Sequence, residues 1–143
     1  MQLTQHTDYA LRALIYIGFQ PDKLHTVAEI SEFYNISQNH MVKVVHQLAM
    51  HGFLDSKRGK HGGLQLGKAA DQINLGDVVR AMETHFHIVE CQNPQGKACR
   101  IDSVCRLKGV LNDATNAFLS TLDEYTLADL ISGKRGQRLS QLL

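Results

Sequence analysis

The stretch TVAEISEFYNISQNHMVKVVHQLAMHG, residues 26–52, contains the boundaries of two short helices separated by a turn. Thr26 and Glu29 have the spacing of a capping box, which begins the first helix. Asn35 is suited to the left-handed conformation that ends this helix, and Ser37 is suited to cap the second. Two short helices joined by a tight turn indicate a helix-turn-helix.

The second helix has one apolar and one polar face. Its apolar residues repeat at intervals of three and four and predict the buried side: Met41, Val44, Val45 and Leu48. The polar residues opposite are suited to base edges and phosphates. On this helix we predict DNA contacts from Ser37, Gln38, Asn39, His40 and Lys43. His46 and Gln47 share that face, and simple solvent exposure is an equally good interpretation for them.

The segment FLDSKRGKHGGLQLGK, residues 53–68, predicts a β-hairpin with a glycine-rich, basic tip. The tip carries Lys57, Arg58 and Lys60, which we expect to contact DNA. In a winged helix-turn-helix, the second helix enters the major groove while the hairpin reaches the backbone or the minor groove. Interaction modules use the same elements, and the net charge of +1 adds little support for DNA.

Further helices are predicted on both sides of this unit. A first helix follows Thr4, which is suited to cap it. After the hairpin, INLGDVVRAMETHFHIVEC (residues 73–91) predicts a short amphipathic helix with Val78, Val79 and Met82 facing inward.

A long helix with an apolar band is predicted from about Ser103 to Leu122. A helix of some 20 residues extends for about 30 Å, and little of the chain is left to cover it. We therefore predict a homodimer seam; packing against the first helix is an alternative use of the band. The expected fold class is mainly α, with a winged helix-turn-helix and small β-hairpin over residues 1–84, a cysteine loop over 85–108, and a dimerisation helix and C-terminal tail over 109–143.

The composition is that of a folded protein without membrane or catalytic motifs. The 143 residues are 43% hydrophobic and 20% charged, which favours one compact unit. The first residues lack a basic start and a small-residue cleavage site, and no apolar run approaches the roughly 18 residues of a membrane span. We expect a cytoplasmic protein that does not bind membranes. No Ser-His-Asp set, phosphate-binding glycine loop or paired-carboxylate motif is apparent, so an enzyme is not expected.

All three cysteines lie in CQNPQGKACRIDSVC, residues 91–105, with gaps of seven and five residues. In a reducing cytosol, an odd set of clustered cysteines favours a metal or redox site over disulfides. Zinc ligands are usually two to four residues apart, whereas these gaps let a loop wrap around an iron-sulfur cluster. The alternatives are a redox thiol set, zinc with His85 or His87 as the fourth ligand, and three buried structural cysteines.

These elements, taken in order, resemble the bacterial winged-helix iron-sulfur repressors, which include the nitric-oxide sensor NsrR and the cluster-biogenesis regulator IscR. The resemblance extends over about residues 1–130. The opening MQLTQHTDYALRALIYI is similar to NsrR-type members, whereas IscR-type members usually have a basic residue in place of Asp8. IscR-type members also carry a histidine three residues after the third cysteine, where this chain has Lys108. The seven-residue gap is longer than the five or six common in the family.

The resemblance implies a set of cluster ligands. Cys91, Cys99 and Cys105 would hold a [4Fe-4S] or [2Fe-2S] cluster, and Asp8 of the other protomer would be the fourth ligand. Arg12 lies one helical turn after Asp8, where it would orient the carboxylate; an exposed ion pair worth a few tenths of a kcal/mol is the alternative.

The resemblance also implies a function. A homodimer would bind palindromic double-stranded DNA as a repressor and release it when the cluster reacts with nitric oxide. A regulator of cluster biogenesis is a related alternative. A cytosolic thiol redox or metal-carrier protein is an alternative of a different class.

Overall fold

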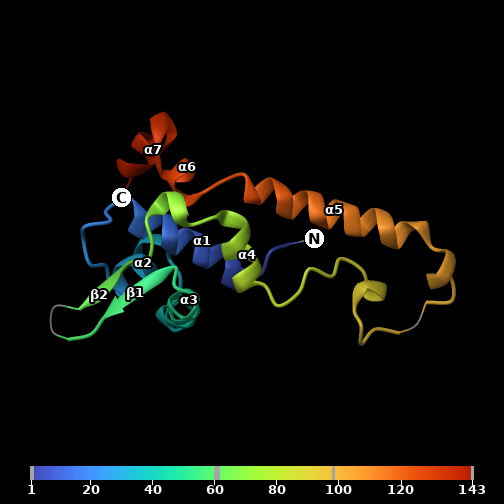
Figure 1. Cartoon of the computed structure of the whole chain (residues 1–143). Coiled ribbons are helices and arrows are strands. Elements are labelled where there is room, and N and C mark those ends of the chain that lie inside the picture. Colours follow the sequence, from blue (N-terminus) through green and yellow to red (C-terminus); the bar gives the residue numbers. More distant parts are fainter. Residues whose placement is uncertain (1, 60–61, 98, 143) are drawn as a thin grey trace.

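The computed structural model describes residues 2–59, 62–97 and 99–142, and it confirms a mainly helical winged helix-turn-helix (Figure 1). The hairpin and the helices form a compact unit, from which one long helix, α5, projects (Figure 1). The α-helices are α1 (Gln5–Gly18), α2 (Val27–Tyr34), α3 (Gln38–Met50), α4 (Leu75–Met82), α5 (Arg106–Asp123), α6 (Leu127–Ile131) and α7 (Gly133–Ser140). The strands are β1 (Leu54–Lys57) and β2 (Gly63–Leu66). Three short 3-10 helices are η1 (Ala70–Gln72), η2 (Glu90–Gln92) and η3 (Asp102–Val104).

The predicted capping residues are confirmed at the starts of α1, α2 and α3. The side chain of Thr4 accepts a hydrogen bond from the backbone N–H of Thr7 at 3.3 Å. At α2, Glu29 N–H donates to Thr26 Oγ1 at 3.1 Å, and Thr26 N–H donates to Glu29 Oε2 at 2.7 Å. Each bond satisfies an N–H group that a helix start would otherwise leave without a partner.

The turn between α2 and α3 has the predicted geometry. Asn35 adopts φ 53°, the left-handed conformation that ends α2. Ser37 then caps α3 by accepting a hydrogen bond from His40 N–H at 3.3 Å. The angle between the two helices is therefore set by a local turn.

The core lies between α1, the helix-turn-helix, α4 and α6. α6 packs on α1 through Leu127, which is 1% exposed and belongs to the core although it follows the long helix. The predicted C-terminal segment, residues 109–143, therefore includes an element that completes the core of the first unit. The buried apolar residues of the helix-turn-helix are Ile30, Met41, Val44, Val45 and Leu48.

The wing is an antiparallel hairpin whose second strand also pairs with a segment outside it. Its strands pair from Leu54 opposite Leu66 to Lys57 opposite Gly63. Leu64 also pairs with the buried His25, because His25 N–H donates to Leu64 O at 2.9 Å and Leu64 N–H donates to His25 O at 2.7 Å. This bridge connects the wing to the segment that precedes α2.

The long helix begins later than predicted, at Arg106, because η3 occupies the preceding turn. At the other end of α5, the Arg80 guanidinium of α4 forms a fork with both carboxylate oxygens of Asp123, at 2.6 and 2.7 Å. The sequence also allowed the long helix to pack against the first helix. In the structure α5 instead packs on α4, and α6 is the C-terminal helix that packs on α1. In the part of the chain that the structure describes, no helix is long and apolar enough to cross a membrane.

Candidate functional site

The exposed face of α3 contains the residues predicted to contact DNA. Gln38, Asn39, His40 and Lys43 are exposed, and so is the capping residue Ser37. The opposite face of α3 is buried in the core, so these side chains point away from the protein body. The helix therefore presents amide, imidazole and ammonium groups, which can hydrogen-bond to bases and phosphates.

The wing adds basic side chains next to α3. β1 packs against α3, and Figure 1 shows the hairpin extending beside this helix. Lys57, at the end of β1, and Arg58 are exposed. Lys60, the third predicted contact, lies outside the described residues. A helix and a basic hairpin placed side by side form the two contact elements of a winged-helix interface.

Gln47 is not a solvent-exposed member of this face. Its amide is half-buried and hydrogen-bonds to His6 Nε2 at 2.8 Å and to the carbonyl oxygen of Ala81 at 2.8 Å. From the sequence, Gln47 was expected either to be exposed to solvent or to contact bases. In the structure its amide is instead occupied by hydrogen bonds to other helices. Its partners are distant in sequence, so no local pattern indicated them.

The three cysteines are free thiols in one loop at the far end of α5 from the winged-helix unit (Figure 1). Cys91 lies in η2 and is half-buried, Cys99 is exposed, and Cys105 is half-buried at the N-cap position of α5. The loop is stabilised locally, by hydrogen bonds such as Asp102 N–H to Cys99 O at 3.1 Å. A loop of this kind can close around a ligand without disturbing the core.

The electrostatics of the loop favour bound negative charge. The N-terminus of α5 faces the loop, and a helix N-terminus stabilises anions. The Lys108 ammonium lies 2.8 Å from Asp102 Oδ1. The hydrogen bond and charge of Asp102, together with the nearby Cys91 and Cys105, raise the pKa of Lys108. Negative charge on the three thiols of the loop would be stabilised by the N-terminus of α5.

Asp8 and Arg12 form the expected pair on the first turns of α1. Arg12 Nε donates to Asp8 Oδ1 at 3.0 Å, and the second Arg12 nitrogen lies 2.7 Å from Asp8 Oδ2. The carboxylate is 45% exposed and borders a hollow formed with Gln2, Leu3, Gln5 and Leu11. Arg12 therefore orients a carboxylate that is accessible from outside the chain.

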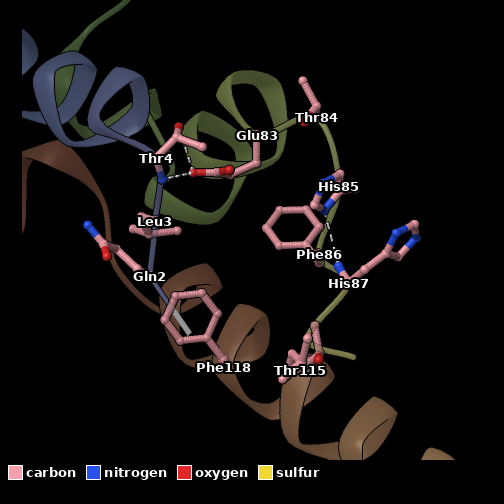
Figure 2. Close-up of a pocket in the computed structure, with 11 residues that line it drawn as sticks. Gln2, Leu3, Thr4, Glu83, Thr84, His85, Phe86, His87, Thr115 and Phe118 are labelled. Atoms are coloured by element: carbon pink, nitrogen blue, oxygen red, sulfur yellow. Dashed lines mark hydrogen bonds between the residues drawn. The ribbon is translucent and has the colours of Figure 1, made fainter. Parts of the chain in front are cut away.

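His85 and His87 lie in the segment between α4 and the cysteines. Their rings stack at a centroid distance of 4.8 Å, and both residues line a hollow of about 330 Å³ between the N-terminus, this segment and α5 (Figure 2). Over residues 2–59, 62–97 and 99–142, no three His, Cys, Asp or Glu side chains are grouped so that they could hold a metal ion. Neither the zinc set with His85 or His87 nor the predicted cluster set is therefore assembled in the single chain.

A family described as "Iron-dependent Transcriptional regulator", Rrf2, matches residues 3–133. The chain belongs to the Rrf2 family. An Rrf2 chain is a transcriptional regulator, as the family description says. This assignment agrees with the prediction of a winged-helix regulator.

Relatives of this chain include proteins named HTH-type transcriptional regulator NsrR. The protein of Halalkalibacterium halodurans is 45% identical over 135 residues, which cover 94% of this chain and 92% of the relative. The protein of Bacillus subtilis (strain 168) has the same identity and the same coverage. The resemblance to NsrR-type regulators is confirmed.

A solved structure supports the fold. CymR (YrzC), the global cysteine regulator of B. subtilis, matches with a TM-score of 0.71 over 91% of this chain and 95% of CymR. The two sequences are 23% identical, so the likeness concerns the fold. It confirms the winged-helix architecture.

Proposed function

We propose that this protein is a homodimeric iron-sulfur repressor that binds palindromic operator DNA and releases it in response to nitric oxide. The observation that carries the proposal is the position of all three cysteines in one loop at the end of α5, in a chain related to NsrR. A regulator that binds DNA in a bacterial cell acts in the cytoplasm, where we place it.

The donor set fits such a cofactor. Cys91, Cys99 and Cys105 are free and at least partly accessible, so their thiols are available as thiolate ligands. Zinc with one histidine is less well supported, because the cysteine gaps of seven and five residues exceed the usual two to four between zinc ligands. When bound, the cluster supplies iron that reacts with nitric oxide, most readily where a carboxylate replaces thiolate, because a carboxylate is the weaker ligand for soft metals.

The shape of the chain supports a ligand from the partner. The C-terminal end of α5 is connected to the winged-helix unit by the Arg80–Asp123 fork, while the N-terminal end carries the cysteine loop. The 18 residues of α5 separate the two ends by about 27 Å. Antiparallel pairing of two α5 helices would bring each loop beside the winged-helix unit of the other protomer, where Asp8 is accessible.

The proposed role of Asp8 explains the absence of a fourth cysteine. Three thiolates from one chain would hold the cluster, while the carboxylate from the other chain would link it to α1. Arg12 would keep this carboxylate oriented by its two contacts. Loss of the Asp8 bond would then change the relative orientation of the two DNA-binding units, as coupling between two sites requires.

The test is anaerobic purification of the wild type and of Cys91→Ala, Cys99→Ala and Cys105→Ala, with Ser103→Ala in the same loop as the matched control. We expect a coloured wild type that contains iron and sulfide, retards a palindromic duplex and releases it on titration with nitric oxide. Each cysteine variant should lose the chromophore and the cluster-dependent part of DNA affinity, while the control keeps both. Circular dichroism should show the same helix content throughout.

Two outcomes would contradict the proposal. Full iron and sulfide occupancy in a cysteine variant would exclude that cysteine as a ligand. A wild type whose DNA affinity is the same with and without the cluster would exclude cluster-dependent repression and favour a thiol redox or metal-carrier protein.

A further inference from the structure

Gln47 connects the recognition helix α3 to two other elements. Its amide oxygen lies 2.8 Å from His6 Nε2 on α1, and its amide nitrogen donates to the carbonyl oxygen of Ala81 on α4 at 2.8 Å. In the described part of the chain, no other side chain of α3 hydrogen-bonds to another helix. The link is thus specific to one residue of the recognition helix.

The chemistry of the partners defines the orientation of the Gln47 amide. The carbonyl of Ala81 can only accept, so the amide NH₂ must point to it and the amide oxygen must point to His6. His6 therefore donates from Nε2. A half-buried amide with both ends satisfied resists displacement, because each lost bond would leave a poorly solvated polar group.

The same two segments are joined a second time by Glu83 and Thr4. Thr4 donates to Glu83 Oε1 from its backbone N–H at 2.7 Å and from its hydroxyl at 3.0 Å (Figure 2). The start of α1 and the end of α4 are thereby connected directly, and Gln47 connects both to α3. We call Thr4, His6, Gln47, Ala81 and Glu83 the helix junction.

The helix junction lies between the two segments that lead to the proposed cluster ligands. His6 precedes Asp8 by two residues on α1, and Ala81 lies in the last turn of α4, from which the chain continues to Cys91. Movement of either segment would therefore act on α3 through the Gln47 amide. The DNA-contacting residues share the rigid helix with Gln47, so they move with it.

We propose, on the basis of the function proposed above, that Gln47 is a positioning residue that couples the cluster-bearing segments to the recognition helix. Hydrogen-bond networks between helices are one physical means of such coupling. Gln47 acts through the orientation of α3 and contacts neither the DNA nor the cluster.

The test uses three variants that separate the two hydrogen bonds. Gln47→Leu removes both; His6→Phe removes the bond to α1; Gln47→Glu keeps an acceptor for His6 but places a second acceptor against Ala81 O. Core residues Met41, Val44 and Leu48 still hold α3 in place, so we expect all three variants to fold. Gln72→Leu, at an exposed glutamine of η1, is the matched control.

The first readout is the ratio of DNA dissociation constants without and with the cluster. We expect this ratio to fall at least about five-fold in Gln47→Leu, which is the lower end of usual allosteric couplings. The iron content and the DNA affinity of the cluster-free protein should stay within about two-fold of wild type. If Gln47 had a merely structural role, its loss would weaken DNA binding equally with and without the cluster, and the ratio would not change. The control should keep the wild-type ratio.

The second readout needs no cluster. The Nε2 proton of His6 should be protected from solvent exchange in nuclear magnetic resonance spectra of the cluster-free wild type and lose this protection in Gln47→Leu. A wild-type ratio retained in Gln47→Leu and His6→Phe would overturn the inference. A ratio near one in the wild type would instead contradict the function proposed above, so the two failures are distinguishable.

Discussion

At the residue scale, the Asp8–Arg12 pair adds little to stability and is therefore available for function. The two side chains are 45% and 44% exposed and lie one turn apart on α1. Such pairs stabilise a helix by about 0.2–0.5 kcal/mol. The fold alone does not require a carboxylate at position 8.

We predict that Asp8→Ala retains iron and sulfide on the three cysteines but has an altered visible spectrum, an altered nitric-oxide titration and weaker cluster-dependent DNA binding. The reason is loss of the proposed ligand from the partner chain. Its unfolding free energy should change by less than about 0.5 kcal/mol. Anaerobic absorbance, nitric-oxide titration and DNA retardation measure these properties.

Arg12→Gln is the matched variant for this prediction, because it breaks the same ion pair and keeps the carboxylate. We expect its spectrum to stay closer to wild type than that of Asp8→Ala, because the carboxylate remains and loses only the two contacts that orient it. Identical spectra and DNA affinities for Asp8→Ala, Arg12→Gln and wild type would show that Asp8 is only the surface partner of Arg12.

At the scale of elements, α2 begins at a capping box that also carries an ion pair. Lys23 Nζ lies 2.7 Å from Glu29 Oε1, while the other Glu29 oxygen accepts from Thr26. The hydrogen bond from Lys23, followed by the bonds from Thr26, lowers the pKa of Glu29 from its usual 4.5 to about 2. The ionised carboxylate therefore stabilises the folded state.

We predict that the contribution of Glu29 to stability is complete above about pH 4.5 and is lost as the pH falls toward about 2, because its pKa is lower in the folded than in the unfolded chain. Glu29→Gln keeps a capping side chain and removes the titration. Urea unfolding should show a deficit for this variant at pH 7 that disappears near pH 2. Glu32→Gln, on the exposed side of α2, is the control and should show no such pH-dependent deficit.

At the scale of the whole molecule, α5 exposes an apolar surface far from the core. Leu107 and Val110 of α5 are 61% and 60% exposed in the single chain, and Val104 of the preceding η3 is 77% exposed. No residue of α5 is buried. Large apolar side chains gathered on a projecting helix mark an interaction surface. A second copy of the chain is the partner that the proposed function requires.

We predict that Leu107→Glu and Val110→Glu convert the proposed dimer to monomers, because each would bury an unpaired carboxylate in the proposed interface. A cost of about 2 kcal/mol or more weakens association by at least about 30-fold. Analytical ultracentrifugation measures the change, and affinity for a full palindrome should fall with it. Ser120→Glu, at an exposed polar position of α5, is the control and should remain dimeric. If all three variants dissociate alike, or if none does, the interface lies elsewhere.

The sequence by itself determined the starts of α1, α2 and α3, the left-handed turn at Asn35, the wing and the gathering of the cysteines. Thr26 and Glu29 bond to each other, and Ser37 bonds to the backbone three residues later. Interactions of this range depend on neighbours in the chain, so spacing alone predicts them. The exposed face of α3 was predictable for the same reason, because helical periodicity defines its opposite, buried face.

Tertiary structure decided what distant residues do. Gln47 shares the polar face of α3 in sequence, but its partners are 41 and 34 positions away, and only the packing of α1 and α4 against α3 brings them within reach. Leu127 likewise joins the core because the chain returns to α1 after α5. Local patterns record neither event, since packing of distant segments depends on the whole arrangement of helices and not on the spacing of nearby residues.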